Sequence, residues 1–291
     1  MNKEDGKMNT TKTKKPRMLF TAFLKKYGRI LIGGTIIATV LFCVAFAPLL
    51  TNYDPEEVGA YEDFKQPPSK EHWLGTDMYG RDMWARLIYG GRTTLIVSIG
   101  AQVLLVILGT ILGLLCGYYK KVEKYLMRFL EAMHTIPSLL FTMLMISVFG
   151  NGVPQMIIAM SIFGVPGLAR MIRNQVLSLR EKEYIESEKA MGASDLRTVF
   201  LHILPACSSY LLVRFSNGLS GMILSMTSLT FLGVGLDPTT ASWGGLVNEG
   251  QKIMFAVPHV ITIPTAMISI TVFGFAMLGD GLRDLLDPRL K

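Results

Sequence analysis

TTLIVSIGAQVLLVILGTILGLLCGYY, residues 93–119, contains no charged side chain. The hydrocarbon core of a bilayer is about 30 Å thick, and a helix needs roughly 20 apolar residues to cross it. This stretch exceeds that length and therefore predicts a transmembrane helix. The whole chain agrees, because half of its 291 residues are apolar and its mean hydropathy is +0.39, too apolar for an ordinary soluble protein of this size.

Apolar stretches on both sides of this one predict five further spans. Residues 30–50 carry no charge, and residues 132–169 carry none over a length that allows two crossings. Gly150-Asn151-Gly152-Val153-Pro154 interrupts the longer stretch with turn-forming residues, which predicts a tight helical hairpin there. We therefore expect an all-α integral membrane protein with six transmembrane helices. The predicted spans are residues 30–50, 93–119, 132–149, 154–171, 208–232 and 257–279.

The first span has a signal peptide as its alternative, since Ala45-Phe46-Ala47 resembles a cleavage site. Pro48 follows directly and should obstruct cleavage, and the polar, basic region before the span is long for a signal peptide. We therefore interpret residues 30–50 as an uncleaved span.

The distribution of lysine and arginine predicts the orientation of the spans, because these residues are enriched in cytoplasmic segments. They are concentrated in residues 1–29, in the connections between spans two and three and between spans four and five, and in residues 283–291. This pattern predicts that both termini are cytoplasmic tails and that residues 51–92 form an extracytoplasmic loop. The net charge of +7 is thus explained by topology, and nucleic-acid binding is a poor explanation of it.

The connection between spans four and five has the pattern of a helical hairpin. EYIESEKAMG, residues 183–192, is a periodic stretch that ends at Gly192, which can adopt the left-handed conformation that closes a helix. Ser194 can cap a second helix, with Asp195 in its first turn. Pro205 predicts a break or kink before span five. Taken alone, such an amphipathic hairpin can also simply lie on the membrane surface.

The same hairpin resembles a signature of the permease subunits of ABC importers, in which Glu-Ala-Ala, three residues and Gly precede a hydrophobic-Leu-Pro ending. Glu186-Ser187-Glu188 takes the first place, Gly192 falls at the required offset, and Leu204-Pro205 closes the segment, although Ser187 and Glu188 replace the two alanines. His202 and Ile203 before the ending look like the peptide-importer variant. The resemblance implies that residues 183–205 form a coupling segment that docks in a cleft of an ATPase subunit, with Glu188 adjusting the fit to a particular ATPase. The residues implied are Glu183, Glu186, Ser187, Glu188, Ala190, Gly192, Leu204 and Pro205.

Further blocks resemble one of the two permease subunits of the oligopeptide/dipeptide (and nickel) uptake family, and the resemblance covers nearly everything from Leu74 to Lys291. Phe231-Leu232-Gly233 and Ser242-Trp243-Gly244 belong to it. The block before span two contains Gly75, Thr76, Asp77, Gly80, Arg81, Asp82 and Arg86. The block at the C-terminal end contains Gly279, Asp280, Gly281, Arg283, Asp284, Asp287 and Pro288.

The charged residues of the first block have two interpretations. Arg81, Asp82 and Arg86 predict a surface helix with an exposed, salt-bridged face, whereas the resemblance implies contact with a substrate-delivering binding protein. The sequence favours the surface helix and leaves the second interpretation open.

The resemblance implies a type I ABC importer permease fold, with the permease domain at residues 93–282 after one additional span. The implied cargo is di- or oligopeptides, with nickel or a metallophore complex as the alternative. The implied partners are a second, homologous permease subunit in a heterodimer, one or two ATPase subunits, an extracytoplasmic substrate-binding protein and the lipid of a bacterial-type inner membrane. ATP and magnesium would be used by the ATPase subunits, and this chain would bind no cofactor.

Small and polar residues inside the spans predict helix contacts. Gly109, Gly113 and Gly117 recur every four residues, a spacing that permits close helix packing in lipid. Asn217 and Ser220 lie within span five, where polar groups usually face protein or a cavity. The sequence leaves open whether they line a translocation path or form interhelical hydrogen bonds.

Two other classes of membrane protein fit the sequence poorly. An intramembrane enzyme needs a nucleophile, an acid–base pair or metal ligands, and no such motif occurs within the spans; Cys43, Cys116 and Cys207 show no disulfide or metal spacing. The fragment closest to a phosphate loop, Gly91-Arg92-Thr93, lacks the lysine, so the chain itself is not expected to be an ATPase. A self-sufficient secondary transporter is disfavoured by the cytoplasmic hairpin and by the lack of a charged relay in the spans.

Overall fold

The computed structural model describes residues 16–286 and, among these, the side chains of residues 27–286. Most of the predicted basic tail (residues 1–29) is therefore outside the described side chains, and Asp287 and Pro288 of the C-terminal block are outside the described residues. The described part is helical and contains no β-strand, only an isolated bridge between Thr76 and Asp82. This confirms the predicted all-α class.

The described helices follow one another with short connections, except for the long loop before α3. In chain order they are α1 (Pro16–Ala45), α2 (Ala47–Leu50), η1 (Tyr61–Asp63), α3 (Met83–Tyr118), α4 (Lys120–Met133), α5 (Ser138–Phe149), α6 (Val153–Arg180), α7 (Glu183–Ala190), α8 (Asp195–Thr198), the π-helical turn η2 (Val199–Ile203), α9 (Leu204–Phe231), α10 (Trp243–Lys252) and α11 (His259–Leu286).

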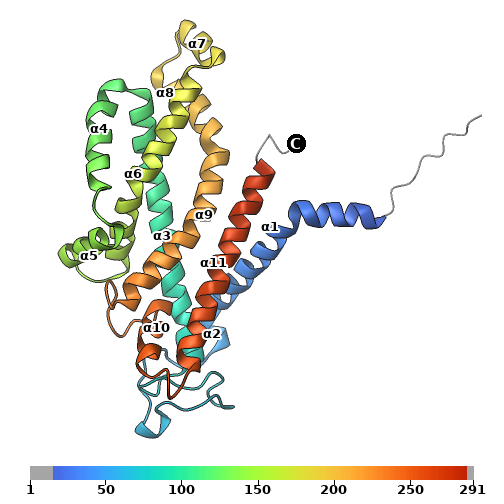
Figure 1. The fold of residues 1–291 in the computed structure, drawn as a ribbon, viewed down its shortest axis with the longest axis vertical. Coiled ribbons are helices and arrows are strands. Elements are labelled where there is room, and N and C mark those ends of the chain that lie inside the picture. The colour runs from blue at the N-terminus through green and yellow to red at the C-terminus, as the bar shows by residue number, and fades with distance from the viewer. Residues whose placement is uncertain (1–15, 287–291) are drawn as a thin grey trace, which may run out of the picture.

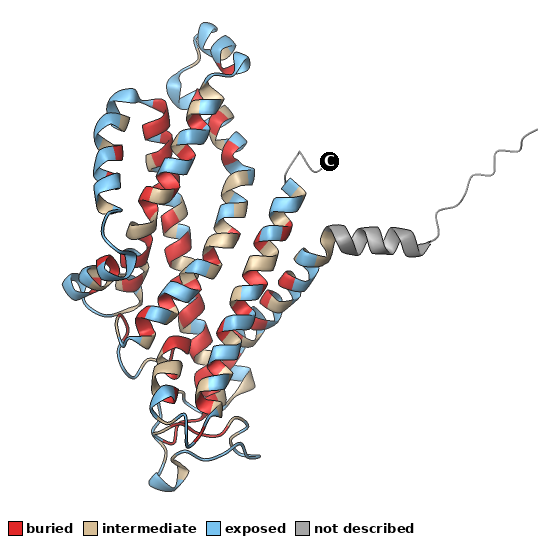
Figure 2. Cartoon of the chain, viewed as in Figure 1, coloured by how far each residue is buried: buried red, intermediate tan, exposed pale blue. Residues whose placement is uncertain are grey.

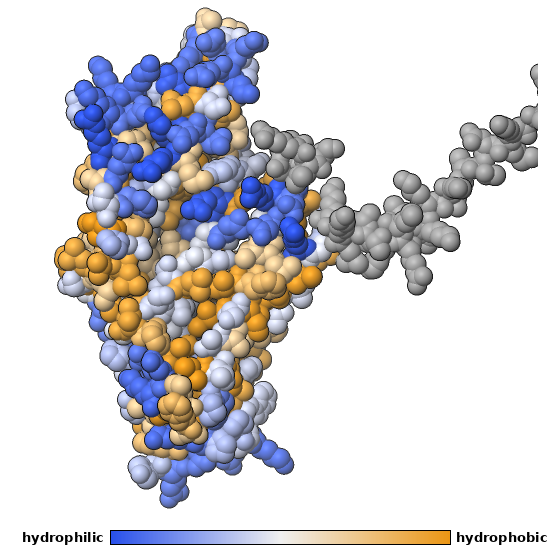
Figure 3. Space-filling view, viewed as in Figure 1, coloured by the Kyte–Doolittle hydropathy of each residue, from blue (hydrophilic) through white to orange (hydrophobic). Residues whose placement is uncertain are grey.

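The long helices run along the length of the molecule. α3, α6, α9 and α11 extend between one end that carries α7 and another that carries α10, called here the α7 end and the α10 end (Figure 1). Five of the described helices are long and apolar enough to cross a membrane, and the bent pair α4–α5 makes a sixth if it is one span. Buried residues gather on the faces that the helices turn toward one another (Figure 2), and a hydrophobic band separates two hydrophilic ends (Figure 3). This arrangement is that of a multi-span membrane protein.

The third predicted span, residues 132–149, is not one straight helix. α4 ends at Met133, α5 begins at Ser138, and the two helices meet at an angle of 93°. Pro137 explains the break, because it has no N–H to donate and disfavours helical geometry in the residue before it. α5 alone is about 18 Å long at 1.5 Å per residue, too short to cross a bilayer core. The basic residues placed in a loop before this span instead lie on the amphipathic α4.

Two further helix boundaries differ from the prediction. α3 begins at Met83 rather than at residue 93, because the Asp82 carboxylate caps it by accepting a hydrogen bond from the Ala85 N–H (2.7 Å). A break or kink was predicted at Pro205, and the helix of residues 195–231 continues through this residue without a break. A π-helical turn precedes the proline, in which the Leu204 N–H bonds to the Val199 carbonyl five residues back. Such a turn adapts the local hydrogen bonding, and this accommodates the proline without interrupting the helix.

The predicted glycine contact is present and joins α3 to α6. A Cβ atom added at Gly109, Gly113 or Gly117 would lie 2.5–2.8 Å from side-chain atoms of α6. The residues it would meet are Leu168, Ile172 and Val176, one for each glycine in order. Real Cβ atoms do not approach this closely, so only glycine permits the contact. α3 packs more extensively against α6 than against any other described helix.

Candidate functional site

The α7 end carries the predicted coupling segment as two short helices around a tight turn. Gly192 has a φ of +86°, the left-handed conformation predicted for it. Its N–H bonds to the Lys189 carbonyl (3.0 Å) and the Ala193 N–H bonds to the Glu188 carbonyl (3.2 Å). These two bonds form the Schellman motif that closes a helix. Ser194 caps α8 as predicted, with its hydroxyl accepting from the Arg197 N–H (3.4 Å).

α7 has one face turned to the bundle and another turned to solvent. Ile185 is fully buried, in a hydrophobic cluster with Ile203 and Cys207. The outer side of α7 carries polar and small residues and the exposed Tyr184, and its exposed residues include four of the predicted coupling residues: Glu183, Glu186, Ser187 and Ala190. At the end of the segment, Leu204 is half-buried and Pro205 is exposed in the first turn of α9.

Glu188 does not lie on the exposed face with these residues. Its side chain is only 13% exposed, and its carboxylate lies 2.8 Å from Nε2 of His202 on η2 and 3.9 Å from Arg197. Glu188, which replaces an alanine of the Glu-Ala-Ala pattern, therefore pairs across the hairpin with His202, which lies just before the hydrophobic-Leu-Pro ending. The interpretation that Glu188 adjusts the fit to a partner is unsupported by this geometry, since the carboxylate stiffens the hairpin from inside.

Tyr118, the last residue of α3, joins the hairpin to the bundle. Its hydroxyl donates to Asp195 of α8 (2.6 Å), and the Lys189 ammonium of α7 lies 4.8 Å from the centre of its ring. The Arg180 guanidinium of α6 lies 5.3 Å from the same ring and donates to the backbone carbonyls of Gly117 (3.1 Å) and Tyr118 (2.8 Å). The ends of α3 and α6 and both hairpin helices thus meet at one buried side chain. The sequence prediction overlooked Tyr118, because only its position at the end of span two distinguished it.

At the α10 end, the block before α3 folds into a compact turn. Gly75 and Gly80 have φ values of +72° and +74°, which residues with a Cβ rarely adopt. The Thr76 hydroxyl accepts from the Gln66 N–H (2.8 Å), which holds the preceding loop against the turn. Asp82 then caps α3.

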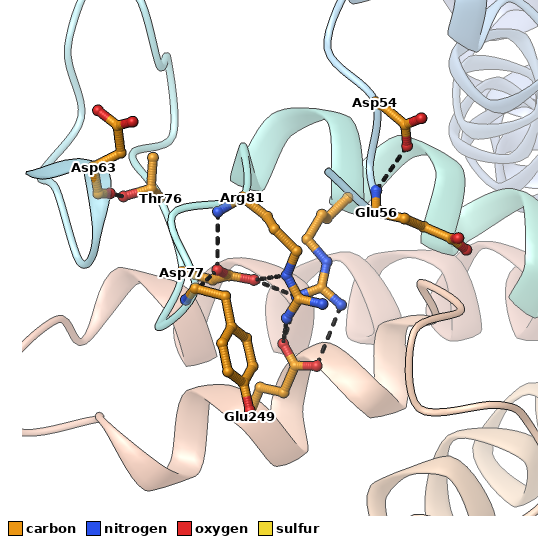
Figure 4. A network of polar contacts seen from close by, with 9 residues as sticks. Asp54, Glu56, Asp63, Thr76, Asp77, Arg81 and Glu249 are labelled. Carbon is orange, nitrogen blue, oxygen red and sulfur yellow. Dashed lines mark hydrogen bonds and ion pairs between the residues drawn. The ribbon is translucent and has the colours of Figure 1, made fainter. Parts of the chain in front are cut away.

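The charged residues of this block form a buried ion cluster with α10. The Asp77 carboxylate accepts from the Arg81 Nε (2.7 Å) and from Arg86. Glu249 of α10 accepts from both arginines, at 2.7 Å from Arg81 and 3.3 Å from the more distant Arg86 nitrogen. Figure 4 shows Asp77 and Arg81 directed toward Glu249. Two positive and two negative charges balance, as burial of charged groups requires.

The prediction of an exposed, salt-bridged helix face is therefore wrong. The side chains of Arg86 and Asp77 are each 1% exposed, and that of Arg81 is 6% exposed. Glu249 completes the cluster from a position more than 160 residues away, and the sequence analysis did not identify it. Little in the sequence marks Glu249 as functional, apart from its being one of only two acidic residues between Phe215 and Lys252.

The polar residues predicted in span five have different surroundings. The Ser220 hydroxyl donates to the Val272 carbonyl of α11 (3.2 Å), which is an interhelical hydrogen bond. Asn217 lines a cavity and also lies against Gly279, where an added Cβ would meet its side-chain oxygen. Their role in a translocation path stays a prediction.

The C-terminal block serves mainly as a packing surface of α11. Gly279 faces α9 and Gly281 faces Ile30 of α1. Asp284 pairs with Arg29 of α1 (2.9 Å), both side chains being well exposed, and Asp280 is exposed. Among the described residues, no group of three or more His, Cys, Asp or Glu could hold a metal ion.

Comparison with known proteins decides the family. Residues 106–291 match the model of the binding-protein-dependent transport system inner membrane component. The chain belongs to this family. Relatives include the glutathione transport system permease protein GsiD of Pectobacterium atrosepticum and of Salmonella typhimurium, each 37% identical over 94% of this chain and 91% of the relative. A putative peptide transport system permease protein of Brucella abortus is 36% identical over 96% of this chain and 94% of the relative.

Family membership confirms several predictions made from the sequence. The chain is a multi-pass permease subunit of an ABC importer in the inner membrane, with the type I importer fold. It is not itself an enzyme, since ATP hydrolysis in such transporters lies in partner subunits. The hairpin of α7 and α8 and the ion cluster are thus features at opposite ends of a permease.

Loss of one partner from the ion cluster should destabilise this permease. Glu249→Gln leaves two buried arginines facing one carboxylate, and breaking a buried pair costs about 3–5 kcal/mol. We expect a clearly lower melting temperature for the purified complex in detergent. Glu57→Gln, which removes an exposed carboxylate of the same loop region, is the matched control and should leave it unchanged. Equal melting temperatures for both variants would show that the cluster carries no stability.

Proposed function

We propose that this permease carries di- or oligopeptides, including short peptides of the glutathione type, across the inner membrane. The supporting observation is that relatives over nearly the whole chain are named glutathione or peptide permeases. We further propose that it pairs with a second, homologous permease in a heterodimer, with one or two ATPase subunits that use ATP and magnesium, and with an extracytoplasmic binding protein that delivers the cargo. This chain contributes half of the path and binds no nucleotide.

The proposed orientation places the α7 end in the cytoplasm and the α10 end outside. Lysine and arginine are enriched on the cytoplasmic side of membrane proteins. α4 carries several of them: Lys120, Lys121, Lys124 and Arg128. They belong to the end of α4 that follows Tyr118, beside the α7–α8 hairpin. Both termini are then cytoplasmic.

The proposed docking element for the ATPase is α7. It projects beyond the neighbouring helices (Figure 1) and presents Glu186, Ser187 and Ala190 to solvent. Its attachment is stiff, because the Schellman turn, the Glu188–His202 pair and the Tyr118 contacts fix it to three bundle helices. A force applied to α7 therefore reaches α3 through Tyr118, and reaches α6 and α9 through the chain itself. A nucleotide-driven movement of the ATPase can then shift the helices between two arrangements.

The cargo is tested on the cognate binding protein and the complete transporter. We expect the binding protein to bind short peptides in calorimetry and the reconstituted complex to take up the same peptides in an ATP-dependent manner. A binding protein that holds nickel chelates and ignores peptides would make the metal the cargo, and the rest of the account would stand.

Substitution of Gly192 tests the docking turn. Valine in the left-handed conformation costs about 1–2 kcal/mol, which should distort the end of α7 and lower ATP-dependent uptake about tenfold while the complex still assembles. Gly192→Asn is the matched control, because asparagine tolerates this conformation. No atom lies within 4 Å of an added Cβ, so neither variant fails through a clash within this chain. Equal uptake by the two variants would contradict the role of the turn.

Tyr118→Phe tests the junction. It removes the hydrogen bond to Asp195 and keeps the ring beneath Arg180 and Lys189. We expect more ATP hydrolysed per peptide transported, because the hairpin can move without α3. The control is Tyr119→Phe at the neighbouring, more exposed tyrosine. For this variant we expect the wild-type ratio of ATP hydrolysed to peptide transported. A wild-type ratio in Tyr118→Phe as well would remove Tyr118 from the coupling route.

A further inference from the structure

A cavity of about 720 Å³ opens between α6, α9 and α11 in the half of the bundle nearer to α7. Its lining includes two cations, Arg214 of α9 and Arg283 of α11. Hydrogen-bonding side chains surround them, among them Gln175, Tyr210 and Asn217. The cavity therefore holds several polar groups within a largely apolar lining, and it is built from helices that are long and apolar enough to span a membrane. Figure 3 shows hydrophilic side chains gathered at this level, above the hydrophobic band.

The two arginines carry charge that nothing in the described part of the chain compensates. Neither Arg214 nor Arg283 makes an ion pair or hydrogen bond with a residue in 27–286. The acidic neighbour of Arg283 in sequence, Asp284, is paired with Arg29 at 2.9 Å. At the α10 end, Arg81 and Arg86 are buried and have two carboxylates between them, whereas Arg214 and Arg283 are exposed and have none.

The orientation of the protein does not account for this arrangement. Cations near the cytoplasmic end satisfy the positive-inside pattern wherever they point. That pattern does not require arginines from two helices to line one cavity together with amide and hydroxyl groups. Both arginines are exposed and line the same cavity, so an anion between or beside them would reduce their mutual repulsion.

We propose that this cavity is a carboxylate-binding subsite on the translocation path, with Arg214 and Arg283 as its donors. The guanidinium group binds carboxylate through two parallel hydrogen bonds, and Asn217 and Gln175 can donate to the same group. Every unmodified linear peptide carries a C-terminal carboxylate, and acidic peptides carry more than one. The subsite therefore attracts peptides on the cytoplasmic side of the path and favours acidic ones. This inference rests on the proposed peptide cargo.

The test compares two tripeptides in one transporter. Ala-Glu-Ala and Ala-Lys-Ala are offered to proteoliposomes that contain the complete complex, with the same binding protein throughout. The quantity measured is the ratio of their initial uptake rates, which does not depend on how much complex each preparation contains. Selection by the binding protein is identical in all preparations, so a change in the ratio reports this chain.

Charge reversal should invert the preference that the cavity contributes. Arg214→Glu is expected to shift the ratio toward Ala-Lys-Ala by about tenfold, the factor for one charge-assisted hydrogen bond. Arg214→Gln should give a smaller shift in the same direction, and Arg214→Lys, which keeps the charge but not the two parallel hydrogen bonds, should give a ratio between those of Arg214→Gln and the wild type. The matched control is Arg128→Gln, at an exposed arginine of α4 outside the cavity, and the wild-type ratio is expected for it.

The possible failures are distinguishable. A wild-type complex that takes up neither peptide contradicts the peptide cargo and overturns the subsite with it. A wild-type complex that transports them, with the same ratio in Arg214→Glu and Arg214→Gln, overturns the subsite alone. If Arg214→Glu does not assemble, Arg214→Gln decides the matter with the same readout.

Discussion

The close packing of α3 against α6 across three glycines is the contact on which the rest of the structure depends. In lipid, helices gain nothing by hiding apolar side chains from one another, so association relies on close backbone approach and on polar contacts. Gly109, Gly113 and Gly117 supply that approach, since any larger residue would meet α6. The pair acts as a rod about 54 Å long, from 36 residues of α3 at 1.5 Å each.

Each end of this rod carries one of the two polar sites. The first turn of α3 contributes Arg86 to the ion cluster, and its last residue is Tyr118. The loop before α3 is thereby fixed to α10, and the proposed docking hairpin is fixed to α3 and α6. In the proposed coupling, this rigid element lets a movement of the hairpin reach the other end of the bundle without large changes inside the helix.

The sequence predicted the features that depend on local chemistry. Apolar length marked the spans, turn chemistry marked Gly192 and Ser194, and spacing marked the glycine contact. It failed where distant residues decide the outcome. Arg81 and Arg86 alternate with carboxylates as a surface helix would, and only the fold brings Glu249 to them. Glu188 and His202 were both visible in the sequence, but their pairing requires the hairpin to close. Pro205 is tolerated because a π-helical turn precedes it, and no local rule predicts that turn.

Distance measurements during ATP binding test most directly whether the hairpin and α3 move as one body. Spin labels at Met191 and Ile107 report hairpin against α3, and labels at Met191 and Ile270 report hairpin against α11; all three positions are exposed. The background lacks the native cysteines Cys43, Cys116 and Cys207. Double electron–electron resonance on the full complex should give the same Met191–Ile107 distance with and without ATP. The Met191–Ile270 distance should change on ATP binding. A Met191–Ile107 distance that changes on ATP binding would contradict rigid transmission through Tyr118.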